Sequence, residues 1–139
     1  MKKLGAAVIG LHMGLGHVQG YKKNPHVEIK AICDLREDVV EKVGNEYGVE
    51  RRVKDYKEIL NMDDVHVVSV ATPDQLHHEQ VIASLRAGKH VLCEKPMALE
   101  VQECKDMIDV SDETGTKLMV GQIGRYAPGF VLTKRLIDQ

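Results

Sequence analysis

The sequence predicts an α/β fold with a doubly wound parallel sheet. Short runs rich in aliphatic and β-branched residues alternate with longer amphipathic segments along the chain. Such alternation is typical of βαβ units, in which a helix crosses from each strand to the next parallel one. The 139 residues match one domain with one core, since a chain of this size buries roughly two-thirds of its unfolded surface.

Six short runs are expected to form the strands. The run VHVVSV at residues 65–70 is the richest in β-branched residues, so we place it at the centre of the sheet. The other strands are expected at residues 4–9, 27–33, 51–53, 90–93 and 117–121. Right-handed crossovers, which are the general rule between parallel strands, make this sheet doubly wound.

Amphipathic helices are expected between the strands. Pro25 ends the first one, because the residue before a proline avoids helical backbone angles. Gly48, Gly88 and Gly115 stand where later helices would end. The expected helices cover residues 14–23, 34–47, 56–61, 76–87 and 99–114. Helical spacing in the last one places four residues on one face, namely Val101, Cys104, Ile108 and Ser111.

A further apolar periodicity begins at Tyr126 and runs to Gln139 without a capping glycine. We therefore expect residues 1–121 to form one domain. Residues 122–139 would then be a linker and a first helix leading towards a second domain. On this interpretation the chain is part of a longer protein.

The composition argues against several classes of partner. There are 19 Lys and Arg against 21 Asp and Glu, a net charge of −2, so no basic surface for nucleic acid or an anionic membrane is expected. No apolar run approaches the roughly 18 residues of a membrane span. The start MKKLGAAVIGLHMG lacks the separate apolar segment and cleavage site of a signal peptide. We therefore expect a cytoplasmic protein.

The cysteines and histidines predict neither disulfides nor a metal site. Cys33, Cys93 and Cys104 are odd in number and widely spaced, which favours reduced thiols. His78 and Glu79 are neighbours in an expected helix, so they do not share a face, and no third ligand follows at suitable spacing. No metal is expected.

A glycine-rich turn, GLHMGLG at residues 10–16, follows the first expected strand. In the pattern G-x-G-x-x-G the first glycine permits a tight turn, the second lets the backbone approach a pyrophosphate, and the third lets the helix pack closely. Gly10 fits the first role and Gly14 or Gly16 the third, but His12 occupies the second. The helix would still offer free N–H groups to an anion. An ordinary strand-to-helix turn is the alternative.

Asp34 stands at the end of the second expected strand, 24 residues beyond Gly10. A carboxylate there can accept hydrogen bonds from both hydroxyls of an adenine ribose. The same side chain could cap the following helix, and the two roles are compatible. Its charge favours NAD because it would repel the 2′-phosphate of NADP, although Arg36 could offset that repulsion.

Four separated motifs make the chain similar to a known family. They are VIGLHMGLGH at residues 8–17, VATPDQLHHE at 70–79, EKPMAL at 94–99 and GQIGRYAP at 121–128. In order and spacing they resemble the N-terminal half of the glucose-fructose oxidoreductase, inositol dehydrogenase and MocA (Gfo/Idh/MocA) family, in which Glu-Lys-Pro is the most diagnostic element. The resemblance implies a Rossmann domain that binds NAD(P).

The resemblance also implies which residues bind the cofactor. The family includes a turn G-x-G-M-G, which Gly10, Met13 and Gly14 match, so that His12 either turns outward or contacts phosphate itself. The implied cofactor-binding residues are Gly10, His12, Met13, Gly14, Asp34, Arg36, Thr72, Pro73, His77, Glu94, Lys95 and Pro96. His77 matches the family's T-P-x-x-x-H histidine. Its alternative is a residue at a helix start whose side chain is satisfied by the backbone.

Lys95 is the catalytic candidate. An ammonium beside the nicotinamide can hydrogen-bond a substrate hydroxyl, stabilise a developing alkoxide or relay a proton, whereas the alternative is a solvated lysine before a proline turn. The resemblance implies a cis Lys95–Pro96 bond and a Glu94 that positions Lys95 or the nicotinamide ribose. It also implies that Arg125 and Tyr126 lead into the second domain and contact it or the substrate.

By resemblance the whole protein is an NAD(P)-dependent oxidoreductase acting on the CH–OH groups of a sugar-like or cyclitol-like alcohol, with NAD as the favoured cofactor and NADP as the alternative. A second α/β domain, which supplies most substrate contacts and an acid–base histidine in the family, would follow Gln139, so this chain alone is expected to be inactive. The full-length form would be a homo-oligomer. Two other interpretations stay open: a dinucleotide-binding or sensor module without catalysis, and a nucleotide fold serving another ligand such as a methyl donor.

Overall fold

A parallel six-stranded sheet forms the centre of the computed structural model, which describes residues 3–139. Met1 and Lys2, the first residues of the expected cytoplasmic start, lie outside the described residues. The strand order is β3-β2-β1-β4-β5-β6, as expected for a doubly wound sheet. The strands are β1 (Leu4–Ile9), β2 (Val27–Cys33), β3 (Arg51–Val53), β4 (Val67–Val70), β5 (His90–Cys93) and β6 (Leu118–Val120).

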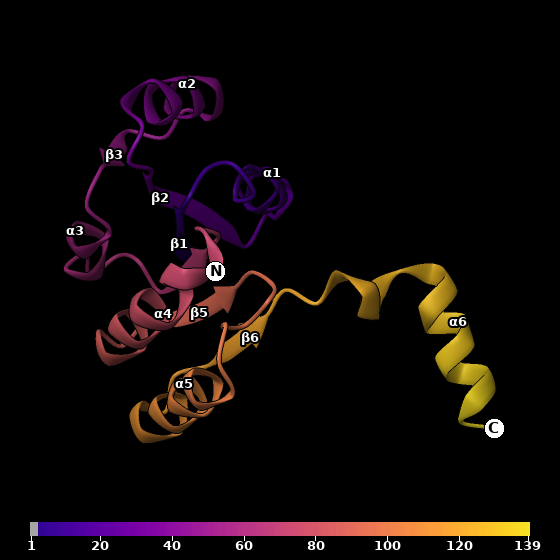
Figure 1. The fold of residues 1–139 in the computed structure, drawn as a ribbon. Coiled ribbons are helices and arrows are strands. Elements are labelled where there is room, and N and C mark those ends of the chain that lie inside the picture. The colour runs from indigo at the N-terminus through magenta and orange to yellow at the C-terminus, as the bar shows by residue number, and fades with distance from the viewer. Residues whose placement is uncertain (1–2) are drawn as a thin grey trace.

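Helices cover the sheet in two groups. α1 (Leu15–Lys23) and α2 (Glu37–Tyr47) lie on one face, and α3 (Tyr56–Leu60), α4 (His77–Arg86) and α5 (Val101–Thr114) belong to the opposite side (Figure 1). This division follows from right-handed crossovers that run in opposite directions from the central strand β1. The topology therefore places the start of α1 at the middle of the sheet.

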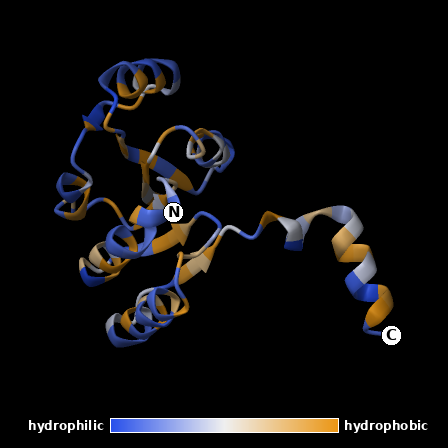
Figure 2. Ribbon diagram, in the orientation of Figure 1, coloured by the Kyte–Doolittle hydropathy of each residue, from blue (hydrophilic) through white to orange (hydrophobic). Residues whose placement is uncertain are grey.

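Two apolar cores fill the space between the sheet and these helices. Successive side chains of a strand point to opposite faces, so Val8 of β1 packs with Val18 of α1, whereas Ile9 packs with Leu85 of α4. Figure 2 shows the resulting apolar centre and the hydrophilic outer surfaces of the helices.

The α1 face of β5 and β6 has no covering helix among residues 3–139. Leu92 and Met119 point to this face, and Met119 is 48% exposed. The last helix, α6 (Pro128–Ile137), stands away from the sheet and buries none of its residues (Figures 1 and 2). Its exposed apolar side chains are Phe130, Leu132, Leu136 and Ile137.

All six expected strands and the five expected helices are present, with small shifts at their ends. The strand expected at residues 65–70 begins at Val67, and the helix expected at 34–47 begins at Glu37. No helix in the described part of the chain is long and apolar enough to cross a membrane.

The predicted buried face of α5 was partly wrong. Val101 is 71% exposed and Ile108 is 49% exposed, whereas Met107 and Val110 are buried. The contacts of α5 with α4 and the sheet turn a neighbouring stripe of the helix inward, because helical spacing alone does not distinguish adjacent stripes.

Candidate cofactor site

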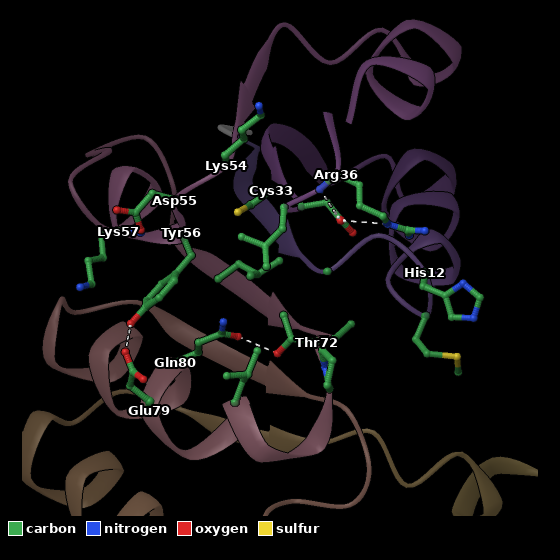
Figure 3. Close-up of a pocket in the computed structure, with 18 of the residues that line it drawn as sticks. His12, Cys33, Arg36, Lys54, Asp55, Tyr56, Lys57, Thr72, Glu79 and Gln80 are labelled. Atoms are coloured by element: carbon green, nitrogen blue, oxygen red, sulfur yellow. Dashed lines mark hydrogen bonds and ion pairs between the residues drawn. The ribbon is translucent and has the colours of Figure 1, made fainter. Parts of the chain in front are cut away.

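A cavity of about 770 Å³ lies at the carboxyl ends of the strands, where open α/β sheets bind ligands. The loops that follow β1, β2, β3 and β4 supply its walls (Figure 3). Part of the predicted cofactor-binding set lies at this cavity, since Gly10, Asp34, Arg36 and Thr72 all line it.

The turn after β1 requires glycine at two positions. Gly10 has a left-handed φ of 84°, and a Cβ on it would lie 2.6 Å from the carbonyl oxygen of Ala71. A Cβ on Gly14 would lie 2.0 Å from the carbonyl oxygen of Gly10, whereas one on Gly16 would have open space. Gly14, and not Gly16, is therefore the glycine that permits close packing of α1.

His12 stands at the edge of this turn. Its side chain is exposed and points outward from the cavity wall (Figure 3), while Met13 beside it is 54% exposed. In the first turn of α1, Gly16 is exposed, while Leu15 and His17 are partly buried. No side chain among the described residues caps the amino end of this helix. Gly16 N–H donates to the carbonyl oxygen of Met13 at 3.2 Å, and the remaining N–H groups of the first turn can face an anion.

Asp34 connects the end of β2 to the glycine turn. Its Oδ2 accepts a hydrogen bond from Leu11 N–H at 2.9 Å, and its Oδ1 accepts one from Arg36 N–H at 3.0 Å. The helix cap considered for Asp34 is wrong, because α2 begins at Glu37, three residues later than expected, and Arg36 occupies the cap position. The Arg36 Nε atom lies 3.6 Å from Oδ1 and partly balances the carboxylate charge.

Several wall residues were missed by sequence reasoning. Tyr56 donates a hydrogen bond to Glu79 at 2.9 Å, and Thr72 donates one to Gln80 at 2.7 Å. Burial and the nearby Glu79 carboxylate raise the pKa of Tyr56 to about 12. Lys54 also lines the cavity and pairs with Glu37. Lys54 and Tyr56 follow β3 while Glu79 and Gln80 lie on α4, and no motif in the sequence connects these two parts of the wall.

His77 is fully buried at the start of α4. Its Nδ1 and Nε2 atoms lie 2.9 Å from the carbonyl oxygens of Pro96 and Thr72, respectively. The expectation of a helix-start histidine satisfied by the backbone describes this arrangement. His77 thus joins the loops after β4 and β5, and its predicted contact with the cofactor stays a prediction.

Glu94 and Lys95 follow β5 in the next loop along the sheet edge, outside the walls of the 770 Å³ cavity. The Lys95–Pro96 peptide bond is cis, as the resemblance implied. Lys95 and Pro96 are exposed, and Lys95 forms no ion pair within residues 3–139. Glu94 Oε2 accepts a hydrogen bond from Lys95 N–H at 3.0 Å. Burial alone would raise the pKa of Glu94, but hydrogen bonds from His17 and Lys95 hold that pKa below its ordinary value.

Arg125 and Tyr126 lie apart from the cavity. They belong to a short 3₁₀ turn, Ile123–Tyr126, and both are exposed. Tyr126 lines a separate hollow on the α1 face, together with Glu94 and Met119. Their expected contacts with substrate or a second domain stay predictions.

No group of three or more His, Cys, Asp or Glu residues in the described part of the chain is arranged to hold a metal ion. His78 instead lies 3.4 Å from Asp106 of α5. This pair sits between the outer helices rather than at the sheet edge.

The family model for the oxidoreductase family with an NAD-binding Rossmann fold matches residues 4–122. The chain belongs to the Gfo/Idh/MocA oxidoreductase family. The match covers the whole sheet and the loops after β1, β2, β4 and β5, so the Gfo/Idh/MocA motifs at residues 10–16 and 94–96 fall inside it.

Two curated relatives illustrate the similarity. An inositol 2-dehydrogenase/D-chiro-inositol 3-dehydrogenase of Lactiplantibacillus plantarum is 34% identical, over 98% of this chain and 39% of its own length. A levoglucosan dehydrogenase of Pseudarthrobacter phenanthrenivorans is 34% identical, over 79% of this chain and 28% of its own. The chain thus spans less than half of these Gfo/Idh/MocA relatives.

Solved structures share the architecture. The scyllo-inositol dehydrogenase of Lactobacillus casei, with bound NAD(H) and scyllo-inositol, superposes with a TM-score of 0.93 at 26% identity, over 99% of this chain and 42% of its own. A 3-ketoreductase of Actinomadura kijaniata in complex with NADP gives a TM-score of 0.89 at 29% identity, over 99% and 44%. This Gfo/Idh/MocA chain therefore has the family's NAD-binding Rossmann fold.

Proposed function

We propose that this chain is the nucleotide-binding half of an NAD-dependent dehydrogenase that transfers a hydride between the nicotinamide and the hydroxyl-bearing carbon of a cyclitol or sugar-like alcohol. The observation that carries the proposal is the position of the glycine turn, Asp34 and Lys95 along one edge of the sheet. The names of the inositol and levoglucosan dehydrogenase relatives support the substrate class. The complete enzyme would act as a homo-oligomer.

The residues of the turn fit the pyrophosphate of a dinucleotide. A Cβ at Gly14 would strike the turn backbone, so this position keeps the start of α1 close to β1. The uncapped N–H groups there would hold the two phosphates. Asp34 would hold the adenine ribose, because each of its oxygens keeps acceptor capacity beyond its one backbone donor.

The cofactor, when bound, supplies a nicotinamide ring that exchanges hydride with the substrate carbon. Lys95 would bind the substrate hydroxyl through its ammonium and stabilise negative charge on that oxygen as hydride leaves the carbon. When the alcohol is oxidised, the Lys95 amine would accept the hydroxyl proton as the hydride moves to the nicotinamide, and in the reverse direction the resulting ammonium would return that proton to the oxygen. Glu94 would orient Lys95 through their backbone hydrogen bond.

NAD is the preferred cofactor in this proposal. Asp34 is held by two backbone N–H groups with its side chain only 12% exposed, so its carboxylate would stay in place and repel a 2′-phosphate. Lys54 pairs with Glu37, and Arg36 Nε lies 3.6 Å from Asp34, so both nearby cations face carboxylates of this chain.

Calorimetric titration of the chain with NADH and NADPH tests this proposal. NADH should bind more tightly. Asp34→Asn, which keeps the size and one acceptor oxygen of the side chain, should shift the ratio of the two affinities towards NADPH by about tenfold. Binding of neither cofactor by the folded chain would contradict the proposal, and an unchanged ratio would contradict the role of Asp34.

A further inference from the structure

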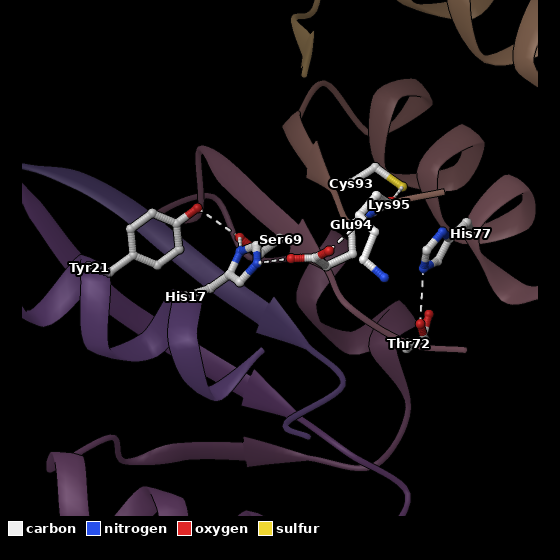
Figure 4. A network of polar contacts seen from close by, with 8 residues as sticks. All are labelled: His17, Tyr21, Ser69, Thr72, His77, Cys93, Glu94 and Lys95. Atoms are coloured by element: carbon white, nitrogen blue, oxygen red, sulfur yellow. Dashed lines mark hydrogen bonds and ion pairs between the residues drawn. The ribbon is translucent and has the colours of Figure 1, made fainter. Parts of the chain in front are cut away.

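A chain of side-chain contacts runs from α1 across the sheet to the Glu-Lys-Pro segment (Figure 4). The Tyr21 hydroxyl lies 2.8 Å from Ser69 Oγ, and Ser69 Oγ lies 3.0 Å from His17 Nδ1. His17 Nε2 in turn lies 3.0 Å from Glu94 Oε1. Three distant parts of the chain thereby meet on the α1 face of the sheet.

The protonation states of Glu94 and Tyr21, at the two ends of this series of contacts, indicate which atom donates in each hydrogen bond. Glu94 is ionised, because its pKa is held below the ordinary value, so His17 Nε2–H donates to it. Burial raises the pKa of Tyr21, which keeps its hydroxyl as a donor. In the tautomer that carries its proton on Nε2, His17 Nδ1 accepts from Ser69 and Ser69 accepts from Tyr21, so each of these groups has a partner.

The His17–Glu94 contact is largely shielded from water. The two side chains are 12% and 13% exposed, respectively. Water therefore cannot fully replace the imidazole as the partner of the carboxylate. A side chain of similar volume without a donor would fill the same space and leave Glu94 Oε1 without this bond.

The Glu94 carboxylate connects His17 to Lys95, the catalytic candidate. One carboxylate oxygen faces His17, and the other accepts the backbone N–H of Lys95. His17 itself lies in the first turn of α1, the helix whose start would hold the pyrophosphate. The same bond therefore connects the phosphate end of the site to the segment at residues 94–96.

We propose that His17 is a positioning residue for the nicotinamide end of the cofactor site. Through Glu94 it holds the backbone of Lys95, and it thereby sets where the lysine ammonium meets the nicotinamide and the substrate hydroxyl. This inference rests on the function proposed above. It assigns to the His17–Ser69–Tyr21 network a role that extends beyond the packing of α1.

A double-mutant cycle on ligand affinity tests the inference. The variants His17→Ala, Glu94→Gln and the double variant are titrated with NADH and with ADP, which lacks the nicotinamide and its ribose. His17→Ala should weaken NADH binding by about tenfold, the loss expected for one hydrogen bond to a charged group. It should change ADP binding by less than about twofold. In the Glu94→Gln background the effect of His17→Ala on NADH should largely disappear.

His66→Ala is the matched control. His66 is also half-buried, and its Nδ1 accepts a hydrogen bond from Gly5 N–H. It directly precedes β4, at the amino ends of the strands, whereas Glu94 follows the carboxyl end of β5. It should alter stability without altering the ratio of NADH to ADP affinity. If His17→Ala does not fold, Ser69→Ala keeps the His17–Glu94 pair and should weaken NADH binding by about twofold to threefold, again only when Glu94 is present.

The outcomes separate the two proposals. Failure of the wild-type chain to bind ADP or NADH would overturn the proposed function and this inference with it. Normal wild-type binding, combined with additive effects of His17→Ala and Glu94→Gln, would overturn the inference alone. An equal loss of ADP and NADH affinity in His17→Ala would also overturn it, because it would assign His17 to the pyrophosphate end.

Discussion

Asp34 holds the glycine turn in place by accepting the Leu11 N–H at 2.9 Å. This bond joins the loop that follows β1 to the loop that follows β2. The two bonded residues, Leu11 and Asp34, are 23 positions apart in the sequence. The carboxylate is thus part of the turn itself as well as a candidate ligand for the ribose.

Asp34→Ala should therefore destabilise the fold. The substitution leaves Leu11 N–H and Arg36 N–H without their carboxylate acceptor, and a hydrogen bond to a charged group contributes about 1.5–3 kcal/mol. We expect the free energy of unfolding, measured by urea denaturation, to fall by about 2 kcal/mol. Glu37→Ala, on the exposed start of α2, is the control. Loss of NADH binding with unchanged stability would limit Asp34 to ligand binding.

Gly14 and Gly16 should respond in opposite directions to substitution by alanine. At Gly14 the new Cβ would lie 2.0 Å from Gly10 O, so the turn must open and both stability and NADH binding should fall sharply. At Gly16 the Cβ meets open space, and alanine in a helix is favoured over glycine by about 0.5–1 kcal/mol. Thermal unfolding of both variants checks this pair. Unchanged stability of Gly14→Ala would show that the turn does not need close packing at Gly14.

His77 should be required for stability because its buried ring lies within hydrogen-bond distance of two backbone carbonyl oxygens, one of which its N–H can satisfy. His77→Leu keeps a side chain of comparable size but removes this donor from the carbonyl oxygens of Thr72 and Pro96. The unfolding free energy should fall by about 1–3 kcal/mol, the cost of an unsatisfied buried polar group. His78, one residue further along α4, pairs only with Asp106 at 3.4 Å, so His78→Leu should lower the unfolding free energy much less. Denaturant titration that ranks the two variants equally would contradict this role.

The three cysteines should differ in reactivity. Burial, reinforced by nearby carboxylates, raises the pKa of the Cys33 and Cys93 thiols to about 12. Thiolate is the reactive form, so both should resist alkylation at pH 8 in the native chain. Cys104 is half-buried and should react first with iodoacetamide. Mass spectrometry of time points locates the label, and labelling of Cys33 before Cys104 would show that the cofactor cavity opens further than the structure indicates.

The fold was predictable because its signals are local. Each strand shows as a β-branched run and each helix as an apolar period of three to four residues, and parallel strands place all their carboxyl ends at one edge. The candidate site followed from that geometry, which is why Gly10 and Asp34 could be paired from spacing alone. Those two residues directly follow Ile9 and Cys33, which are paired between the neighbouring strands β1 and β2.

Other features depend on distances that no local pattern contains. His17 and Glu94 are 77 residues apart, and their contact exists only because α1 packs over the strand next to β5. The choice of Gly14 over Gly16 depends on which Cβ would meet the turn. The rotation that exposes Val101 and buries Met107 depends on where α4 lies beside α5.

The sequence by itself thus determined the alternation of elements and the edge of the sheet that carries the site, because hydrophobic period and turn chemistry act over a few residues. Only the tertiary structure decided which side chains hold that site in place. Hydrogen bonds such as His77 to Thr72 and Pro96, or His17 to Glu94, form within about 3 Å, and that precision arises from packing among elements distant in the chain.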